Sequence, residues 1–211
     1  MNYEVASKTL PGGHRVVVEY DQDPVSPREW DNVGTVVLHE RCRYSFGDET
    51  ASGDTLREIA DDPNNIVLPV YLYDHGGITI RTSAFSCRWD SGQVGIIYCT
   101  KQRAIKEWGK KILTKKVREQ VISYMQGEIK ELDQYLTGQV FGYRIYDPEG
   151  NELDSCWGYM EEDYCMSEGV SLAECREARM MEERAAAWRS ALREARERRY
   201  WESRDIVTTT E

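Results

Sequence analysis

The sequence predicts an α+β fold, in which a mostly antiparallel sheet carries one long amphipathic helix and a second long helix follows at the C-terminus. Three observations support this prediction. The 211-residue chain contains short apolar or alternating runs separated by Gly, Pro, Asp and Ser, a pattern typical of strands joined by tight turns. Residues 117–136 instead carry an apolar group every three or four positions, as amphipathic helices do. Residues 171–205 contain neither Pro nor Gly, which predicts a long unbroken helix.

Turn and cap signals place the expected elements of the first hundred residues. A short helix is expected over residues 55–62, with Asp54 or Thr55 as its cap. Asp74-His75-Gly76-Gly77 is expected to turn a hairpin, because glycine readily adopts positive φ. The strands expected here are HRVVVEYDQD (14–23), the start of GTVVLHERCRYSFGDE (34–49), NIVLPVYLYD (65–74), GITIRTSA (77–84) and GQVGIIYCT (92–100).

The segment after Thr100 changes to helical periodicity. A short basic helix is expected first, and then a helix of about twenty residues with Thr114 placed to cap it. Gly127 stands in the interior of this second helix, where glycine is unfavourable. Gly138 is expected to end the helix, and two strands should follow around the turn Asp147-Pro148-Glu149-Gly150.

The chain is expected to divide into one globular domain and an appended helix. Residues 1–160 carry the strand and turn signals of the α+β domain, and residues 161–170 are expected to form a linker. Ser171 and Glu174 make a capping box, so a charged amphipathic helix is expected over residues 171–205. Residues 206–211 are expected to form a disordered tail.

The C-terminal helix carries a narrow apolar stripe with near-heptad spacing. Met181, Trp188 and Leu192 are its largest members, and their spacing is close to that which joins one helix to another. Such a stripe buries little by itself, because alanines interrupt it. Two alternatives follow: the helix docks on the domain, or it pairs with a second copy or with a partner helix.

Composition favours a cytoplasmic protein without a cofactor. The sequence has no run of 18 apolar residues and no signal-peptide pattern at its N-terminus, so membrane and secretory interpretations are both unsupported. Its six cysteines lack close C-x-x-C spacing, and no local pair of metal ligands appears among its three histidines. Free thiols in a reducing compartment are therefore expected.

The net charge of −10 is unevenly distributed. Residues 101–118 hold eight basic side chains and one acidic one, so the rest of the domain is strongly acidic. An acidic surface repels nucleic acid, favours basic partners and can imitate DNA toward a DNA-binding protein. Direct binding of nucleic acid is thus not expected, and solubility alone is the competing explanation of the charge.

A polar cluster within residues 68–100 is the strongest candidate for catalysis. Asp74 and His75 end one expected strand and Asp90 precedes another, so the three share one sheet edge if these strands are neighbours. They would then provide a general base with an orienting carboxylate, or bind a divalent metal, in a hydrolase or nuclease. Asp, Ser and Gly are also turn residues, and tight turns are the simpler explanation.

The basic stretch is a second candidate site. Its cationic side chains could hold phosphate groups and its tryptophan could stack on a base, which would make the protein a sponge for a nucleotide signal. A solvated basic helix face is the competing interpretation. The candidate residues are Lys101, Arg103, Lys106, Trp108, Lys110 and Lys111.

Several segments together resemble a known set of proteins. REWDNVGTVVLHERCRYSFGDE, IVLPVYLYDHGGITI, FSCRWDSGQVGIIY, DQYLTGQVFGYRIYD and DSCWGYM are similar to segments of small accessory proteins of tailed bacteriophages and prophages, over roughly residues 16–160. The resemblance implies a phage origin and the cytoplasm of a bacterial host, and it brings no catalytic residues. Such proteins often act in host takeover or block immunity. It therefore implies a binding protein that inhibits or sequesters a host factor, such as a nucleic-acid-handling defence protein, in preference to an enzyme.

Overall fold

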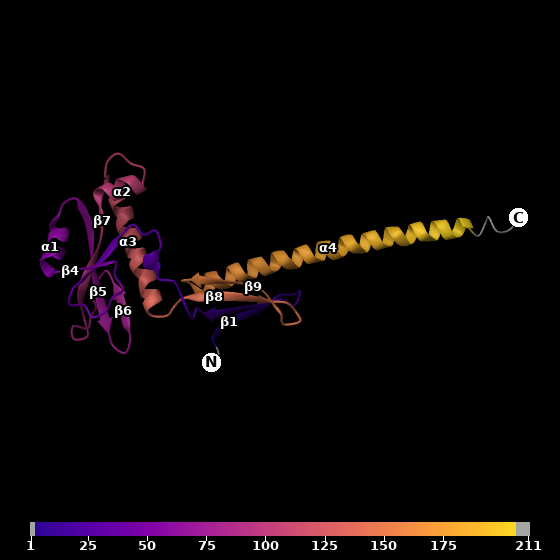
Figure 1. Cartoon of the computed structure of the whole chain (residues 1–211), viewed down its shortest axis with the longest axis horizontal. Helices are drawn as coiled ribbons and strands as arrows, with labels where there is room; N and C mark the ends of the chain where they lie inside the picture. Colours follow the sequence, from indigo (N-terminus) through magenta and orange to yellow (C-terminus); the bar gives the residue numbers. More distant parts are fainter. Residues whose placement is uncertain (1–2, 206–211) are drawn as a thin grey trace. The chain divides into compact units, whose positions relative to one another are not determined.

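The computed structural model describes the backbone of residues 3–205 and the side chains of residues 3–201, which form two compact units (Figure 1). Within these residues, unit 1 comprises residues 3–19, Gly142–Cys156 and residues 162–205, and unit 2 comprises Tyr20–Phe141 and Trp157–Glu161. This division differs from the expected single domain over residues 1–160. Local strand signals do not identify the partner of each strand, and here late strands pair with the N-terminal ones.

Unit 2 is built on a five-stranded mixed sheet. Its strands are β3 (Thr35–His39), β4 (Glu49–Ala51), β5 (Asn65–Asp74), β6 (Ile78–Arg81) and β7 (Ser91–Thr100), in the spatial order β4-β3-β7-β5-β6. β3 and β4 are parallel, and the other neighbouring pairs are antiparallel. β5 and β6 form the expected hairpin, with Gly76 at φ 75° in its turn.

The helix α3 (Lys115–Leu136) packs on this sheet and closes the core of unit 2. It is capped as expected by Thr114, whose hydroxyl accepts the Val117 N–H at 3.3 Å. Each large apolar side chain that α3 buries contributes about 1.5–3 kcal/mol, which outweighs the cost of about 1 kcal/mol for a glycine in the helix interior. The buried apolar stripe of α3 is Val117, Val121, Met125, Ile129 and Leu132.

Three short helices complete unit 2. η1 (Pro27–Glu29) is a single 3-10 turn before β3, α1 (Gly53–Asp61) contacts β3 and β5, and α2 (Lys101–Glu107) follows β7 and contacts α3. The cap of α1 differs from the expectation. Ser52 accepts the Thr55 N–H at 3.2 Å, because Asp54 and Thr55 already lie inside the helix.

Unit 1 contains a four-stranded sheet and the long helix α4 (Figure 1). The strands are β1 (Glu4–Thr9), β2 (Arg15–Tyr20), β8 (Phe141–Tyr146) and β9 (Glu152–Tyr159), in the order β1-β2-β8-β9. The sequence analysis did not predict β1, because EVASKT is too polar to stand out as a strand. The turn between β8 and β9 is the expected one, and the Asp147 N–H donates to the Asn151 carbonyl across it at 2.9 Å.

The helix α4 (Glu162–Asp205) begins before the expected cap at Ser171. Residues 161–170 therefore belong to the helix almost entirely and do not form the expected linker. Cys165, Gly169 and Val170 are buried, and Gly169 approaches Val16 and Tyr143 of the sheet so closely that a Cβ there would clash. This packing outweighs the local cap signal. The expected tail of residues 206–211 lies outside the described residues.

The fold is α+β, as expected. Within residues 3–205, no helix combines the length and apolar character that a bilayer-spanning segment requires. The six cysteines are free. Burial raises the pKa of the Cys165 thiol to about 12, so this thiol stays protonated at neutral pH.

Candidate functional site

The pairing of β5 with β7 brings together two of the three catalytic candidates. The Asp74 N–H donates to the Asp90 carbonyl at 2.8 Å, and His75 Nδ1 lies 3.4 Å from Asp90 Oδ2. The two strands are therefore neighbours, as the catalytic hypothesis requires. The His75 side chain is nevertheless largely exposed to solvent, and an exposed pair lacks the burial that tunes catalytic groups.

The carboxylate of Asp74 is bound by side chains other than His75 and Asp90. It accepts hydrogen bonds from Arg43 Nη2 at 2.6 Å and from the Tyr44 hydroxyl at 2.7 Å. The Tyr44 hydroxyl, and next the Arg43 guanidinium, hold the pKa of Asp74 below its ordinary value of 3.8. In the described part of the chain, no group of three or more His, Cys, Asp or Glu side chains is placed to hold a metal ion. Asp74 thus anchors the segment that follows β3.

Replacing Asp74 by asparagine should remove the acid sensitivity that this anchor contributes. A carboxylate with a lowered pKa stabilises the folded state above pH 3.8, and this contribution is lost as the pH falls through the lowered pKa. Urea unfolding curves of the wild type and Asp74→Asn should therefore differ near pH 6 and converge in strong acid. The Asp90→Asn variant makes the matched change at the same sheet edge and serves as the control. An identical change in both variants would contradict the anchor.

Trp89 lies beside the same edge of the sheet. Its side chain is 96% exposed, and it lines a shallow hollow of about 300 Å³ together with Arg43, Asp74 and Asp90. Replacing so exposed a side chain disturbs little core packing. Trp89 is therefore a useful control position for binding experiments.

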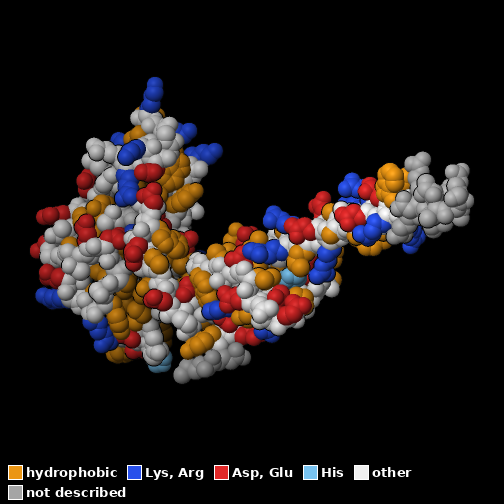
Figure 2. Space-filling view, turned by 45° about the vertical axis from the view of Figure 1, so that its right-hand side comes forward, with side chains coloured by type: hydrophobic (Ala, Val, Ile, Leu, Met, Phe, Trp, Pro, Cys, Tyr) orange, Lys and Arg blue, Asp and Glu red, His pale blue; other side chains and the backbone are white. Residues whose placement is uncertain are grey.

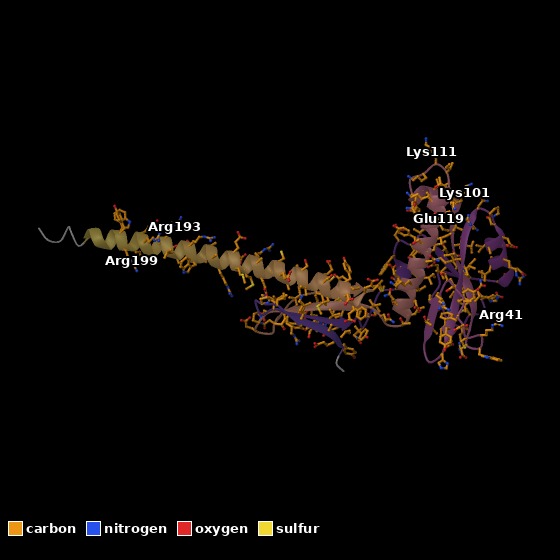
Figure 3. The ribbon with its side chains drawn as sticks, turned by 180° about the vertical axis from the view of Figure 1, so that it is seen from behind. Arg41, Lys101, Lys111, Glu119, Arg193 and Arg199 are labelled. Carbon is orange, nitrogen blue, oxygen red and sulfur yellow. The ribbon has the colours of Figure 1, made fainter. Side chains whose placement is uncertain are left out.

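The candidate side chains of the basic stretch fall into two groups: exposed lysines, and residues that make contacts inside the protein. Arg103 donates a hydrogen bond to the Asn32 carbonyl. Trp108 packs edge-to-face on Tyr124, with 5.4 Å between ring centroids. These two residues, which would orient a nucleotide, thus make contacts inside the protein. The exposed members are Lys101, Lys106, Lys110 and Lys111, of which Figure 3 labels the first and the last.

Arg103 and Trp108 support a hollow of about 440 Å³ on unit 2, which the sequence analysis did not identify. Trp30 and Tyr124 line it, and their side chains are 43% and 59% exposed. Gly127 of α3 also lines it, and a Cβ added there would meet no atom within 4 Å. The glycine that weakens the helix therefore leaves the hollow open. Its acidic members are Asp31, Glu128 and Glu131.

The loop that carries Trp30 is held in place by three side chains. Asn32 Nδ2 donates to two carbonyls of this loop region at 2.8 and 2.9 Å, and Arg103 holds the Asn32 carbonyl. The Glu128 carboxylate accepts the Val33 N–H at 2.6 Å. Because all of these bonds join groups of the protein itself, they preorganise the hollow for binding.

The electrostatics of the hollow favour a cation. Burial, and next the negative charge of Glu128, raise the pKa of Glu131 above its ordinary value of 4.5. The surrounding groups thus stabilise the Glu131 carboxylate poorly. A cation beside Glu131 would stabilise this charge and would also be attracted by the faces of Trp30 and Tyr124. The arrangement can therefore bind a guanidinium or ammonium group.

The apolar stripe of α4 is exposed. Trp188 is 67% exposed, Met181 61% and Leu192 38%. From Ala178 to Trp201, every residue of α4 is exposed or half-buried. The sequence offered two alternatives for this helix, docking on the domain or pairing with another helix. Within the described residues, the apolar stripe does not dock on the rest of the chain.

Comparisons with known proteins give no information on the function of this chain. No protein-family model matches the chain, and no curated protein or solved structure matches it. The resemblance to phage accessory proteins therefore depends on the sequence segments alone. In proteins generally, function depends on specific sites and does not follow from the fold alone.

The residues of the hollow are distant in sequence. Trp30 precedes β3, whereas Tyr124 and Glu131 lie on α3, and only the packing of the η1 region on α3 brings them together. Gly127 is the signal in the sequence that points to this site. A residue that breaks a local rule inside a regular element often marks a functional position.

Proposed function

We propose that the protein is a non-catalytic binding protein that captures a basic partner protein, with an arginine or lysine side chain of the partner inserted in the hollow beside Trp30 and Tyr124. The observation that carries this proposal is that two exposed aromatic rings line one hollow together with Glu131, whose pKa is raised. The hollow is open because Gly127 places no side chain in it. In this proposal the protein is a phage accessory protein that inhibits or sequesters a nucleic-acid-handling host factor.

The net charge of the chain supports a basic partner. It is −10, and Figure 2 shows acidic side chains at the outer edge of unit 2 and basic ones at its top. Proteins that bind nucleic acid present Lys and Arg on their binding face. Occupying one of these side chains and covering its neighbours would block their contacts with phosphate, and the association should weaken as salt increases. Part of the negative charge lies at α1, which contacts β3 and β5; Asp54, Glu58, Asp61 and Asp62 are exposed there.

The alternative functions receive less support from the geometry. A hydrolase or nuclease would need Asp74 together with His75 and Asp90, but the Asp74 carboxylate is bound by Arg43 and Tyr44. A nucleotide sponge would need Arg103 and Trp108 in the site, and both make internal contacts. Each remains an alternative to the binding proposal.

Binding to the hollow can be measured with a basic probe. An oligo-arginine peptide should bind the wild-type chain in a calorimetric titration at low salt. Trp30→Ala should weaken this binding by about thirtyfold, the effect of removing an interface hot spot. Affinity should also fall as the pH drops toward the raised pKa of Glu131, because protonation removes the charge that attracts the peptide. Trp89→Ala is the matched control and should bind like the wild type.

Gly127→Leu separates binding from folding in the same experiment. The added side chain would fill the hollow, while the loss of a helix-interior glycine should raise the free energy of unfolding by about 0.8 kcal/mol. We expect a variant that unfolds at higher temperature but binds the peptide weakly. Full binding by Gly127→Leu, or equal losses in Trp30→Ala and Trp89→Ala, would overturn the hollow as the site.

The partner itself can be sought with the same variants. Wild type, Trp30→Ala and Trp89→Ala would be used to capture proteins from bacterial lysate, with and without added DNA. The proposal expects a protein that wild type and Trp89→Ala retain, that Trp30→Ala loses, and that DNA displaces. A retained protein that is indifferent to both Trp30→Ala and DNA would contradict the proposed mode of inhibition.

A further inference from the structure

We infer that α4 pairs antiparallel with α4 of a second copy of this chain, in a register that places Trp188 opposite Ala185 of the second copy. This inference concerns unit 1 and does not depend on the hollow of unit 2. Among the described side chains of α4, Ala173 is the last that is buried, and the helix continues from there to Trp201 over roughly 40 Å. Most helical stability in proteins comes from packing of an apolar face, and no described residue covers the face here.

The apolar stripe follows a heptad pattern. Steps of three and four residues alternate without interruption, as the a and d positions of a two-helix seam require. Each of these positions is exposed or half-buried and is thus accessible to a second helix. The seam positions are Ala178, Met181, Ala185, Trp188, Leu192 and Ala195.

The sizes of these side chains favour an antiparallel pair. When Trp188 faces Ala185 of the second copy, Met181 faces Leu192, so large and small groups alternate across the seam. A parallel pair would place each residue opposite itself. Two Trp188 rings would then compete for one layer, and two Ala185 methyl groups would leave a gap in the next. Close packing disfavours both the crowded and the empty layer.

The charged residues that flank the seam favour the same orientation. In the antiparallel register, Glu182 lies beside Arg189 of the second copy, and this pair occurs twice. A parallel pair would instead bring Arg184 beside Arg189. Neighbouring like charges destabilise helix pairs, whereas opposite charges stabilise them.

The charge of α4 also changes sign along its length. Residues 162–177 hold five acidic side chains and one arginine, whereas residues 189–199 hold five arginines and two glutamates. In the proposed register, residues 189–199 lie along residues 174–184 of the second copy, which hold four glutamates and three arginines, and Glu174 faces Arg199 of the second copy. Figure 3 labels Arg199 and Arg193 on this basic stretch.

The sheet of unit 1 leaves this path along α4 accessible. The helix faces the sheet through Cys165, Gly169 and Ala173, whereas Glu174 and Ala178 on the seam side are exposed. Beside the seam, the Glu177 carboxylate accepts the Gly12 N–H at 3.2 Å and lies 2.9 Å from His14 Nδ1, so it holds α4 on the sheet. The seam side of the helix beyond Glu177 therefore stays open to a second helix.

Sedimentation equilibrium of the full chain tests the pairing, and charge reversal tests its orientation. The wild type should dimerise, and Arg189→Glu should weaken the dimer by about tenfold, because it places a second acid beside Glu182 in both symmetric contacts. The same change would strengthen a parallel dimer, in which position 189 meets Arg184. Glu182→Arg combined with Arg189→Glu should restore wild-type affinity. Arg193→Glu makes the same change on the outward face and should have no effect.

The possible results distinguish the antiparallel pair from a parallel pair and from a monomer. A chain that stays monomeric at all concentrations, or a dimer that Arg189→Glu strengthens or leaves unchanged, would overturn the inference. Trp188→Ala should also raise the dissociation constant, because it empties two layers of the seam. Since these side chains are exposed in the single chain, circular dichroism and thermal unfolding of the sheet and core should show that every variant is folded.

Discussion

Replacing Glu128 by alanine should lower the free energy of unfolding by about 3 kcal/mol, the cost of leaving buried charged and polar groups without their partner. The Glu128 carboxylate accepts the N–H groups of Val33 and Gly34 at 2.6 and 3.1 Å, and Arg28 Nη1 lies 3.3 Å from it. Without it, both N–H groups lose their acceptor. Arg28 keeps Asp48 as an acidic partner, which places the expected effect at the lower end for buried ion pairs.

The matched control for this experiment is Glu119→Ala. Glu119 is exposed on the same helix (Figure 3), and its ion pair with Lys115 is loose, with 3.9 Å between the charged atoms. Exposed pairs of this kind contribute little, so urea unfolding should change by less than about 0.5 kcal/mol. A similarly small change in Glu128→Ala would mean that the carboxylate does not hold the loop at the hollow.

Gly95→Ala should destabilise unit 2 by about 3 kcal/mol or prevent it from folding. A Cβ at this position would lie 2.2 Å from the Val37 carbonyl oxygen and 2.9 Å from the Leu38 Cα on β3. Both are backbone atoms of a neighbouring strand inside the sheet, so they cannot rotate away as a side chain could. The variant must separate β3 from β7, and thermal unfolding should show this as a large drop in melting temperature.

Gly92→Ala is the control on the same strand. A Cβ at Gly92 would meet no atom within 4 Å, so its melting temperature should stay close to that of the wild type. Equal stability of the two variants would contradict the close approach of β3 and β7 at Gly95.

Elements with a strong local signal could be predicted from the sequence. Thr114 caps α3 and Gly76 turns the β5–β6 hairpin because the geometry of these residues is set by their immediate neighbours. The start of α4 could not be predicted in this way. Ser171 has the features of a cap, yet the packing of Gly169 on Val16 and Tyr143 continues the helix through it.

The candidate site was harder to predict than the fold. From the sequence, His75 and Asp90 share an edge only if their strands are neighbours, and the observed pairing of β5 with β7 meets this condition. It cannot show that the Asp74 carboxylate is already bound, since Arg43 and Tyr44 come from a different loop. The sequence also suggests that the Trp108 ring is free to stack on a base, whereas in the structure this ring packs on Tyr124.

The connectivity of the two units has a consequence for synthesis of the chain. Nearly all of unit 2 is inserted between β2 and β8, and its ends meet: the Asp21 N–H donates to the Val140 carbonyl at 2.8 Å. At a translation rate of about 5–20 residues per second, β2 leaves the ribosome roughly ten seconds before its neighbour β8. A two-stranded hairpin of β1 and β2 is only marginally stable during this interval, whereas the inserted unit already contains all five strands of its sheet. The sheet of unit 1 is therefore completed last, and its unpaired β2 edge is the part of the nascent chain most open to mispairing and to chaperones.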